Sequence, residues 1–203
     1  MAEKDVTEKL LEDHNDVFAD IVNGLLFGGE QVVKPAELSE SLTRSMYKTA
    51  KGKLHEQERD VVKRWERTGV NISIIGLENQ SKVDRKMPLR VLGYDGAAYR
   101  SQYKEKMPAP VVTLVLYFGE DRWKKPRSLK EILKIPSELE PFVNDYKLNI
   151  YEIAWLTEEE IGRFTSDFRV VANFYDTRFS KHHERGACAP GSECFGKPNK
   201  NEQ

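Results

Sequence analysis

Three polar side chains that follow a short apolar run are the residues of this chain best suited to chemistry. Glu78, Gln80 and Lys82 come directly after residues 72–77, a β-branched run bounded by polar segments. Such a run predicts a buried strand, and alternate side chains of a strand share one face. If the strand continues, a carboxylate, an amide and an ammonium therefore point the same way and could hold a metal ion. The alternative is that the strand simply emerges into solvent.

A second carboxylate, Asp60, lies in a charged segment that admits two interpretations. Good helix formers over residues 53–68 favour a helix. The alternative is a strand over residues 59–65, paired with the next strand across a turn at Thr68-Gly69. In an α/β fold, the strand would allow Asp60 to meet Glu78 from an adjacent strand.

Two close carboxylates beside an amide and a cation would suit Mg²⁺, which prefers hard oxygen ligands and keeps several waters. A bound Mg²⁺ lowers the pKa of a water ligand and offsets charge that develops on a phosphate. Lys82 could orient the attacking water or stabilise the phosphate, because an ammonium is a compact point charge. Asp60 and Glu78 are therefore the predicted metal ligands if the strand interpretation is correct.

The remaining elements predict an α/β fold with a mixed sheet. Apolar residues at intervals of three and four predict a helix over residues 7–27, ended by Gly28-Gly29. A second helix is expected to begin near Pro88, and a third to begin at Thr157 and run to about Tyr175. Further strands are predicted at residues 45–47, 111–118 and 148–156.

Charge is distributed unevenly along the chain, although the net charge is only -1. Residues 1–40 carry a net charge of -7, residues 44–130 carry +10, and residues 131–176 carry -6. A basic middle segment suits a phosphodiester backbone, whereas the alternative is that the charges scatter over several faces. Trp123, in a basic loop, either stacks on a base or sugar or anchors the loop. The candidates for contact with a DNA backbone are Arg85, Lys86, Arg90, Arg100 and Lys124.

Composition excludes several classes of protein. No apolar run reaches the length that spans a membrane, and no secretory signal is visible at the N-terminus. Both cysteines fall in residues 179–203, predicted to be a disordered tail, so residues 1–178 are expected to form one domain suited to a reducing cytoplasm. A zinc site in the tail is disfavoured, because the spacing of its ligand types matches no standard finger. Those ligand types are His182, His183, Cys188 and Cys194.

Five short motifs, taken together in their order and spacing, resemble one known family. They are NDVF at 15–18, ERDV at 58–61, GLENQ at 76–80, MPLRVLGYDG at 87–96 and VNDY at 143–146. This set resembles the recombination-promoting nuclease / putative transposase family of bacteria, a branch of the PD-(D/E)xK nuclease superfamily. The resemblance covers about residues 12–178.

The resemblance implies a restriction-endonuclease-like core, with a central mixed sheet flanked by helices, and Mg²⁺-dependent cleavage of DNA. It implies that Asp60, on a strand, and Glu78 are metal ligands, and that Gln80 stands where the superfamily usually has a lysine. Lys82 is our hypothesis for a migrated replacement of that lysine. Asp16, on the first helix, becomes an accessory acid, although its own surroundings in the sequence favour solvation of both Asp16 and Asp20.

Three classes of function remain open. The first is a Mg²⁺-dependent DNA endonuclease associated with recombination or transposition. The second is a nuclease-derived module that binds DNA or a partner with weak or no catalysis. The third is a structural α/β domain whose charges are only solvated. A homodimer is a further expectation, because superfamily nucleases often pair to cut both strands.

Overall fold

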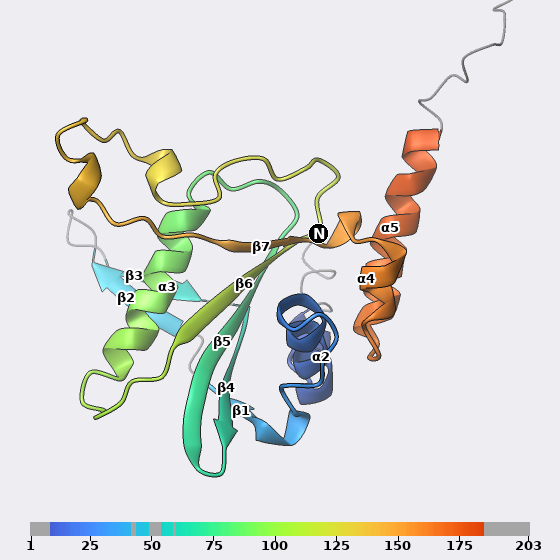
Figure 1. Cartoon of the computed structure of the whole chain (residues 1–203), viewed down its shortest axis with the longest axis horizontal. Coiled ribbons are helices and arrows are strands. Elements are labelled where there is room, and N and C mark those ends of the chain that lie inside the picture. Colours follow the sequence, from blue (N-terminus) through green and yellow to red (C-terminus); the bar gives the residue numbers. More distant parts are fainter. Residues whose placement is uncertain (1–8, 42–43, 49–53, 59, 185–203) are drawn as a thin grey trace, which may run out of the picture.

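A five-stranded mixed sheet with helices on both faces forms the body of the protein (Figure 1). The computed structural model describes residues 9–41, 44–48, 54–58 and 60–184. The sheet has the order β1-β4-β5-β6-β7. Its strands are β1 (Leu38–Glu40), β4 (Val61–Arg67), β5 (Val70–Gln80), β6 (Val111–Tyr117) and β7 (Asn149–Glu152). The predicted α/β class and mixed sheet are therefore confirmed.

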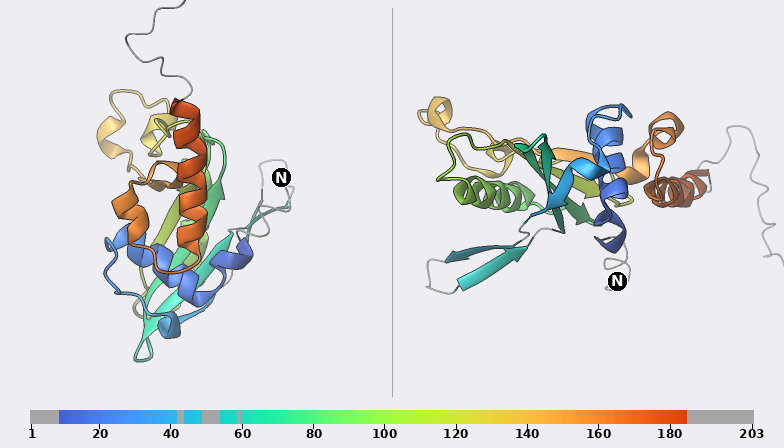
Figure 2. Two further views of the ribbon diagram at one scale, coloured as in Figure 1. Left: turned by 90° about the vertical axis from the view of Figure 1, so that its right-hand side faces the viewer. Right: turned by 90° about the horizontal axis from the view of Figure 1, so that it is seen from below.

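The helices make up layers on either side of this sheet. One face carries α3, and the other carries α2 with α4 and α5 beyond it (Figures 1 and 2). The α-helices are α2 (Asn15–Leu26), α3 (Met87–Ser101), α4 (Glu158–Gly162) and α5 (Phe168–Glu184). Short 3-10 helices are η1 (Pro35–Glu37), η2 (Lys130–Ile132), η3 (Glu140–Phe142) and η4 (Ile153–Trp155). No helix among these described residues is both long and apolar enough to cross a membrane.

A separate two-stranded hairpin, formed by β2 (Arg44–Lys48) and β3 (Leu54–Glu58), connects β1 to β4. It extends away from the sheet in Figure 2. β2 contains the short strand predicted around residues 45–47, whereas β3 falls where the charged segment allowed a helix.

The strand interpretation of the segment around Asp60 is confirmed for β4, and the helical interpretation of residues 53–68 is wrong. β4 pairs antiparallel with β5, with Val61 opposite Leu77. The turn between them uses positive φ angles at Thr68 (51°) and Gly69 (77°), as a tight hairpin turn requires. β5 then pairs in parallel with β6, which requires a crossover, and α3 supplies it.

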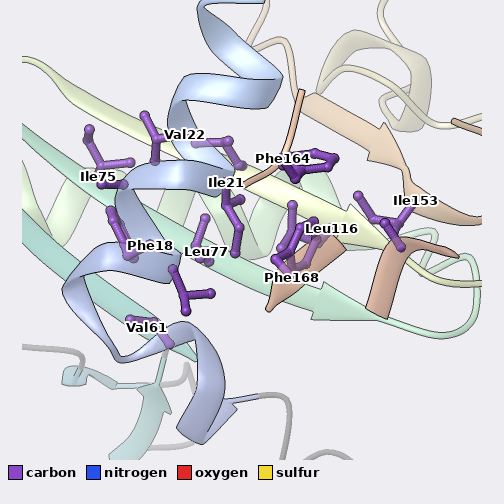
Figure 3. Packing of buried hydrophobic residues seen from close by; sticks show 14 of the residues in the cluster. Phe18, Ile21, Val22, Val61, Ile75, Leu77, Leu116, Ile153, Phe164 and Phe168 are labelled. Carbon is purple, nitrogen blue, oxygen red and sulfur yellow. The ribbon is translucent and has the colours of Figure 1, made fainter. Parts of the chain in front are cut away.

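The larger hydrophobic core lies between the sheet and α2 (Figure 3). Phe18, Ile21 and Val22 of α2 point towards Leu77 of β5 and Leu116 of β6. Gly24 of α2 allows the close approach of α4 and the turn after it, because a Cβ atom there would lie 2.4 Å from the ring of Phe164.

A smaller core lies on the α3 face of the sheet and includes Met87, Val115 and Trp123. Trp123 is only 1% exposed, its indole N–H donates to the carbonyl of Pro126 (2.8 Å), and its ring meets Tyr117 edge to face. Trp123 therefore anchors its loop, and the alternative of stacking on a nucleobase is wrong.

The helix boundaries predicted from the sequence differ from those in the structure. The helix predicted over residues 7–27 is interrupted at Asp13–His14, so that a separate helical turn precedes α2. The helix predicted from Thr157 to Tyr175 is two helices, because α4 ends at Gly162 and α5 begins at Phe168. Thr157 does cap α4 as expected, through a capping box with Glu160.

Two predictions for the C-terminal part of the chain also differ from the structure. The strand expected over residues 148–156 is shorter, since β7 ends at Glu152 and η4 follows. α5 continues to Glu184, so that residues 179–184 are helical. Cys188 and Cys194 lie outside the described residues.

Asp20 explains the break between α4 and α5. It is 4% exposed and accepts hydrogen bonds from the backbone N–H and the hydroxyl group of both Thr165 and Ser166. These bonds, 2.7–2.9 Å long, fasten the turn before α5 to α2. The expectation that Asp20 is solvated is therefore wrong.

Replacement of Asp20 by alanine should destabilise the protein strongly. The change removes the buried acceptor of four part-buried hydrogen bonds from Thr165 and Ser166, so we expect the free energy of unfolding to fall by about 2–4 kcal/mol. Asp16→Ala is the matched control, because Asp16 is exposed one turn earlier on α2; it should change stability by less than about 0.5 kcal/mol. Urea unfolding of both variants measures the difference, and equal stabilities would contradict the assigned role of Asp20.

Candidate functional site

Glu78 is a buried acid near the end of the central strand. Register pairs it with Val115 of β6, which places it on the α3 face of the sheet. Only 1% of the residue is exposed. Its Oε1 atom accepts hydrogen bonds from the Arg90 guanidinium and from the side-chain amide of Gln80 (3.3 Å). Its Oε2 atom is buried without a hydrogen-bond partner, which is costly for a carboxylate oxygen unless a ligand engages it.

Arg90, on α3, is the cation that balances Glu78. Its Nη2 atom pairs with Glu78 and lies 3.3 Å from the Tyr94 hydroxyl, and its Nη1 atom lies 3.4 Å from Asp84. Arg90 was expected on the exposed side of α3 as a contact for DNA, and its pairing with a buried acid was not foreseen. Its side chain nevertheless keeps 34% of its surface exposed, compared with 2% for Glu78.

Burial raises the pKa of Glu78 to about 7. Desolvation of the charged form is the largest cause, and the positive charge of Arg90 offsets only part of it. The negative charge of Asp60 raises the pKa further. Near neutral pH, the Glu78 carboxyl group therefore exchanges a proton readily.

Asp60 lies immediately before β4 and faces the same strand end. Its Oδ2 atom accepts a hydrogen bond from the backbone N–H of Asn79 (2.7 Å), and its Oδ1 atom forms an ion pair with Lys9 (2.5 Å). The structure thus brings Asp60 beside the end of β5, as the strand interpretation predicts, although Asp60 itself precedes the first residue of the strand.

Glu12 is an acid at this site that the sequence did not reveal. It is 1% exposed, and its Oε2 atom accepts a hydrogen bond from the side-chain amide of Asn79 (2.8 Å). Glu12 comes from the helical turn before α2, on the opposite face of the sheet from Arg90. The break at Asp13–His14 changes the direction of that turn, so the periodicity of a continuous helix gave no signal for Glu12.

Two of the predicted site residues lie apart from this cluster. Asp16 is exposed on α2, and in the described part of the chain no hydrogen bond or ion pair joins it to Asp60 or Glu78. Lys82 lies beyond β5, which ends at Gln80, and is exposed. The expectation that Lys82 continues the strand face of Glu78 and Gln80 is therefore wrong, whereas Gln80 does contact Glu78.

The other candidates for contact with DNA are exposed but scattered. Arg85 and Lys86 lie just before α3, on the same end of the helix as Arg90. Arg100 lies ten residues further along α3 than Arg90, which is about 15 Å at the usual helical rise. Lys124 is in the loop that Trp123 anchors.

A hollow of about 340 Å³ opens beside Asp60. Its lining includes Lys9, Asp13 and Glu40, together with Asp60 itself. Asp13 also pairs with Lys63, a buried lysine of β4 (2.7 Å, with 3% of its side chain exposed). Asp60 therefore lines a hollow as well as contacting Asn79.

Residues 64–180 match the model of a protein family described as putative transposase, YhgA-like. The chain belongs to this family. Comparison with curated proteins gives no match, and comparison with solved structures gives none either. The matched segment of this YhgA-like protein contains Glu78, Gln80 and Arg90, whereas Asp60 and Glu12 precede it. The transposase part of the predicted resemblance is confirmed, and membership of the PD-(D/E)xK superfamily stays a prediction.

Two carboxylates of this site, those of Asp60 and Glu78, are of the kind that holds a Mg²⁺ ion. Glu78 offers a buried oxygen without a hydrogen-bond partner, and Asp60 lies close enough to influence the pKa of Glu78. Mg²⁺ is commonly held by only one or two carboxylates, with waters completing its shell. Over the ranges that the structure describes, no group of three or more His, Cys, Asp or Glu residues suits a metal ion. The fit to Mg²⁺ therefore rests on two carboxylates, those of Asp60 and Glu78.

The raised pKa of Glu78 makes the stability of the protein depend on pH. The folded protein holds a proton that the unfolded chain releases above its ordinary pKa of 4.5, so this contribution to stability is complete below 4.5 and is lost as the pH rises to about 7. Glu78→Gln lacks the titrating group. Relative to wild type, it should therefore gain roughly 2 kcal/mol in the free energy of unfolding between pH 5 and pH 7.5.

Urea unfolding of both proteins at the two pH values measures this change. The two proteins share all other titrating groups, so the comparison removes the contributions of the groups that do not interact with Glu78. Parallel pH dependences for the two proteins would contradict a raised pKa at Glu78.

Proposed function

We propose that this protein is a Mg²⁺-dependent DNA endonuclease that acts in recombination or transposition. The observation that carries the proposal is the buried, unpartnered Oε2 atom of Glu78 beside Asp60 at the end of the central strand. Membership of a family described as transposases supports DNA as the substrate, because movement of DNA segments requires phosphodiester bonds to be broken.

In this proposal, Asp60 and Glu78 hold the metal. Mg²⁺, when bound, lowers the pKa of a water ligand and offsets charge on the phosphate. Glu78 binds a cation only in its ionised form, and the positive charge of Arg90 favours that form. Gln80 steadies the Oε1 atom of Glu78 through its amide, which leaves Oε2 directed to the metal.

The remaining acids and bases take supporting roles. Glu12 orients Asn79, whose backbone N–H in turn positions Asp60. We assign Glu12 the part of accessory acid that the resemblance gave to Asp16, because Glu12 is connected to the site by hydrogen bonds. Lys82 and the exposed cations before α3 would contact the DNA backbone outside the metal site. The exposed cations before α3 are Arg85 and Lys86.

A DNA-binding module without catalysis is the second candidate. Two observations favour it. The neutral Gln80 contacts Glu78, and both candidate metal ligands are paired with cations, Asp60 with Lys9 and Glu78 with Arg90. Such pairing lowers the negative potential that attracts a metal. A cleavage assay separates the two candidates.

Supercoiled plasmid incubated with the wild-type protein and Mg²⁺ should be converted to nicked or linear DNA, and EDTA should prevent this. Asp60→Asn and Glu78→Gln each remove a charged metal ligand with little change in shape, so each should lower cleavage by about 100-fold or more. Linear product formed before nicked circles are exhausted would indicate two active sites acting together, as in a homodimer.

Glu66→Gln is the matched control, since Glu66 is an exposed acid further along β4; it should cleave as wild type does. Cleavage that survives both Asp60→Asn and Glu78→Gln would refute the site. Salt-dependent DNA binding without any cleavage by the wild-type protein would favour the binding module.

A further inference from the structure

Arg90 of α3 is the cation that contacts the buried carboxylate of Glu78. The Arg90 guanidinium contacts Glu78, and it also contacts Tyr94 and Asp84. Three contacts of this kind fix the plane of a guanidinium, because its donors lie in a rigid fork. Arg90 is thus held in place before any ligand arrives.

The exposure of Arg90 differs sharply from that of its partner. One-third of the Arg90 side chain reaches solvent, at 34%, whereas the Glu78 side chain is 2% exposed. An arginine has five N–H donors, and the three acceptors that engage Arg90 use only Nη1 and Nη2. Arg90 therefore presents a charged, partly open surface directly over the carboxylate that is proposed to bind the metal.

The strand itself supplies no competing cation at this position. Gln80, two residues after Glu78 on the same face, is neutral and donates to the same Oε1 atom as Arg90 does. Lys82 lies past the end of β5 and is exposed. Arg90 is the cation in direct contact with Glu78, and guanidinium groups bind phosphate oxygens in a bidentate manner.

We propose that Arg90 is the phosphate-binding residue of the site, bridging Glu78 and the phosphodiester that lies at the metal. This inference rests on the proposed function. Arg90 then takes the phosphate-stabilising role expected from the sequence for Lys82. It contacts the substrate as well as Glu78. The N-terminal end of α3, where Arg90 lies, adds the positive end of the helix dipole at the same place.

The test compares Arg90→Gln and Arg90→Lys with wild type by two measurements. The first is the dependence of duplex DNA affinity on salt concentration, in EDTA without Mg²⁺. The second is the single-turnover cleavage rate with Mg²⁺ at saturating DNA. Lys104→Gln is the control, because Lys104 is an exposed cation in the loop after α3; it should match wild type in cleavage rate.

For Arg90→Gln we expect the slope of log affinity against log salt to fall in magnitude by about 0.9, the value for one lost phosphate contact. We expect its cleavage rate to fall by about 100-fold. Arg90→Lys keeps the charge but cannot bridge two groups with a planar fork, so its affinity should persist while its rate falls by about 10-fold.

A role limited to holding Glu78 would lower the cleavage rate and leave the salt slope of Arg90→Gln unchanged, and that result overturns the proposal. If Arg90→Gln does not fold, Arg90→Lys decides, and a wild-type rate in that variant overturns the proposal. Failure of the proposed function is recognised by a different result, namely that the wild-type protein does not cleave DNA with Mg²⁺. The salt slope still reports on Arg90 in that case, because it is measured without Mg²⁺.

Discussion

The end of β5 encloses a carboxylate that the protein neutralises only in part. Glu78 has a cation on one oxygen and nothing on the other, and a buried charge must be compensated for the fold to be stable. The compensation comes from α3, which supplies Arg90 to Glu78. Asp60, just before β4, accepts a hydrogen bond from the backbone N–H of Asn79 and adds a second negative charge near Glu78. The fold around this strand end is therefore organised by electrostatics as much as by apolar packing.

The α2 face of the sheet carries the larger apolar core, and the α3 face carries the Glu78–Arg90 pair of the candidate site. The α2 face is closed by aromatic and aliphatic side chains and fastened by Asp20. The α3 face carries a smaller apolar core and buried polar contacts, among them Asp95, which accepts from Thr113 (2.6 Å) and from Tyr146. Polar groups that are tied to one another in this way hold the neighbouring helix in register with the sheet. The face that bears Arg90 is thus held together by buried polar contacts as well as by its small apolar core.

Local patterns predicted the sheet well and the polar site only in part. Length and β-branched composition were enough for β5 and β6, because both strands are buried and need apolar residues throughout. The helical pattern over 7–27 was correct in phase for α2, yet it could not show the break at Asp13–His14. Periodicity also gave no sign that Asp20 would be an acceptor for Thr165, since that contact joins residues 145 positions apart.

The candidate site shows the same limit. Alternation along β5 placed Glu78 and Gln80 correctly, since both lie within the strand. It failed for Lys82, because nothing in the alternation marks the residue at which a strand stops pairing. Arg90 was recognised as basic but was assigned to the surface, since its pairing with Glu78 depends on how α3 packs on the sheet. Contacts between elements are fixed by tertiary packing, which short patterns do not encode.

The family match and the folding unit have different boundaries. The match begins at residue 64, inside β4, and so it leaves out α2, β1 and the first half of a strand in the middle of the sheet. A fragment cut at that boundary would expose the apolar face that α2 covers and would lose Asp60. The segment that matches the family model is therefore not a complete folding unit. Its physical domain must include the helix and strand that come before it.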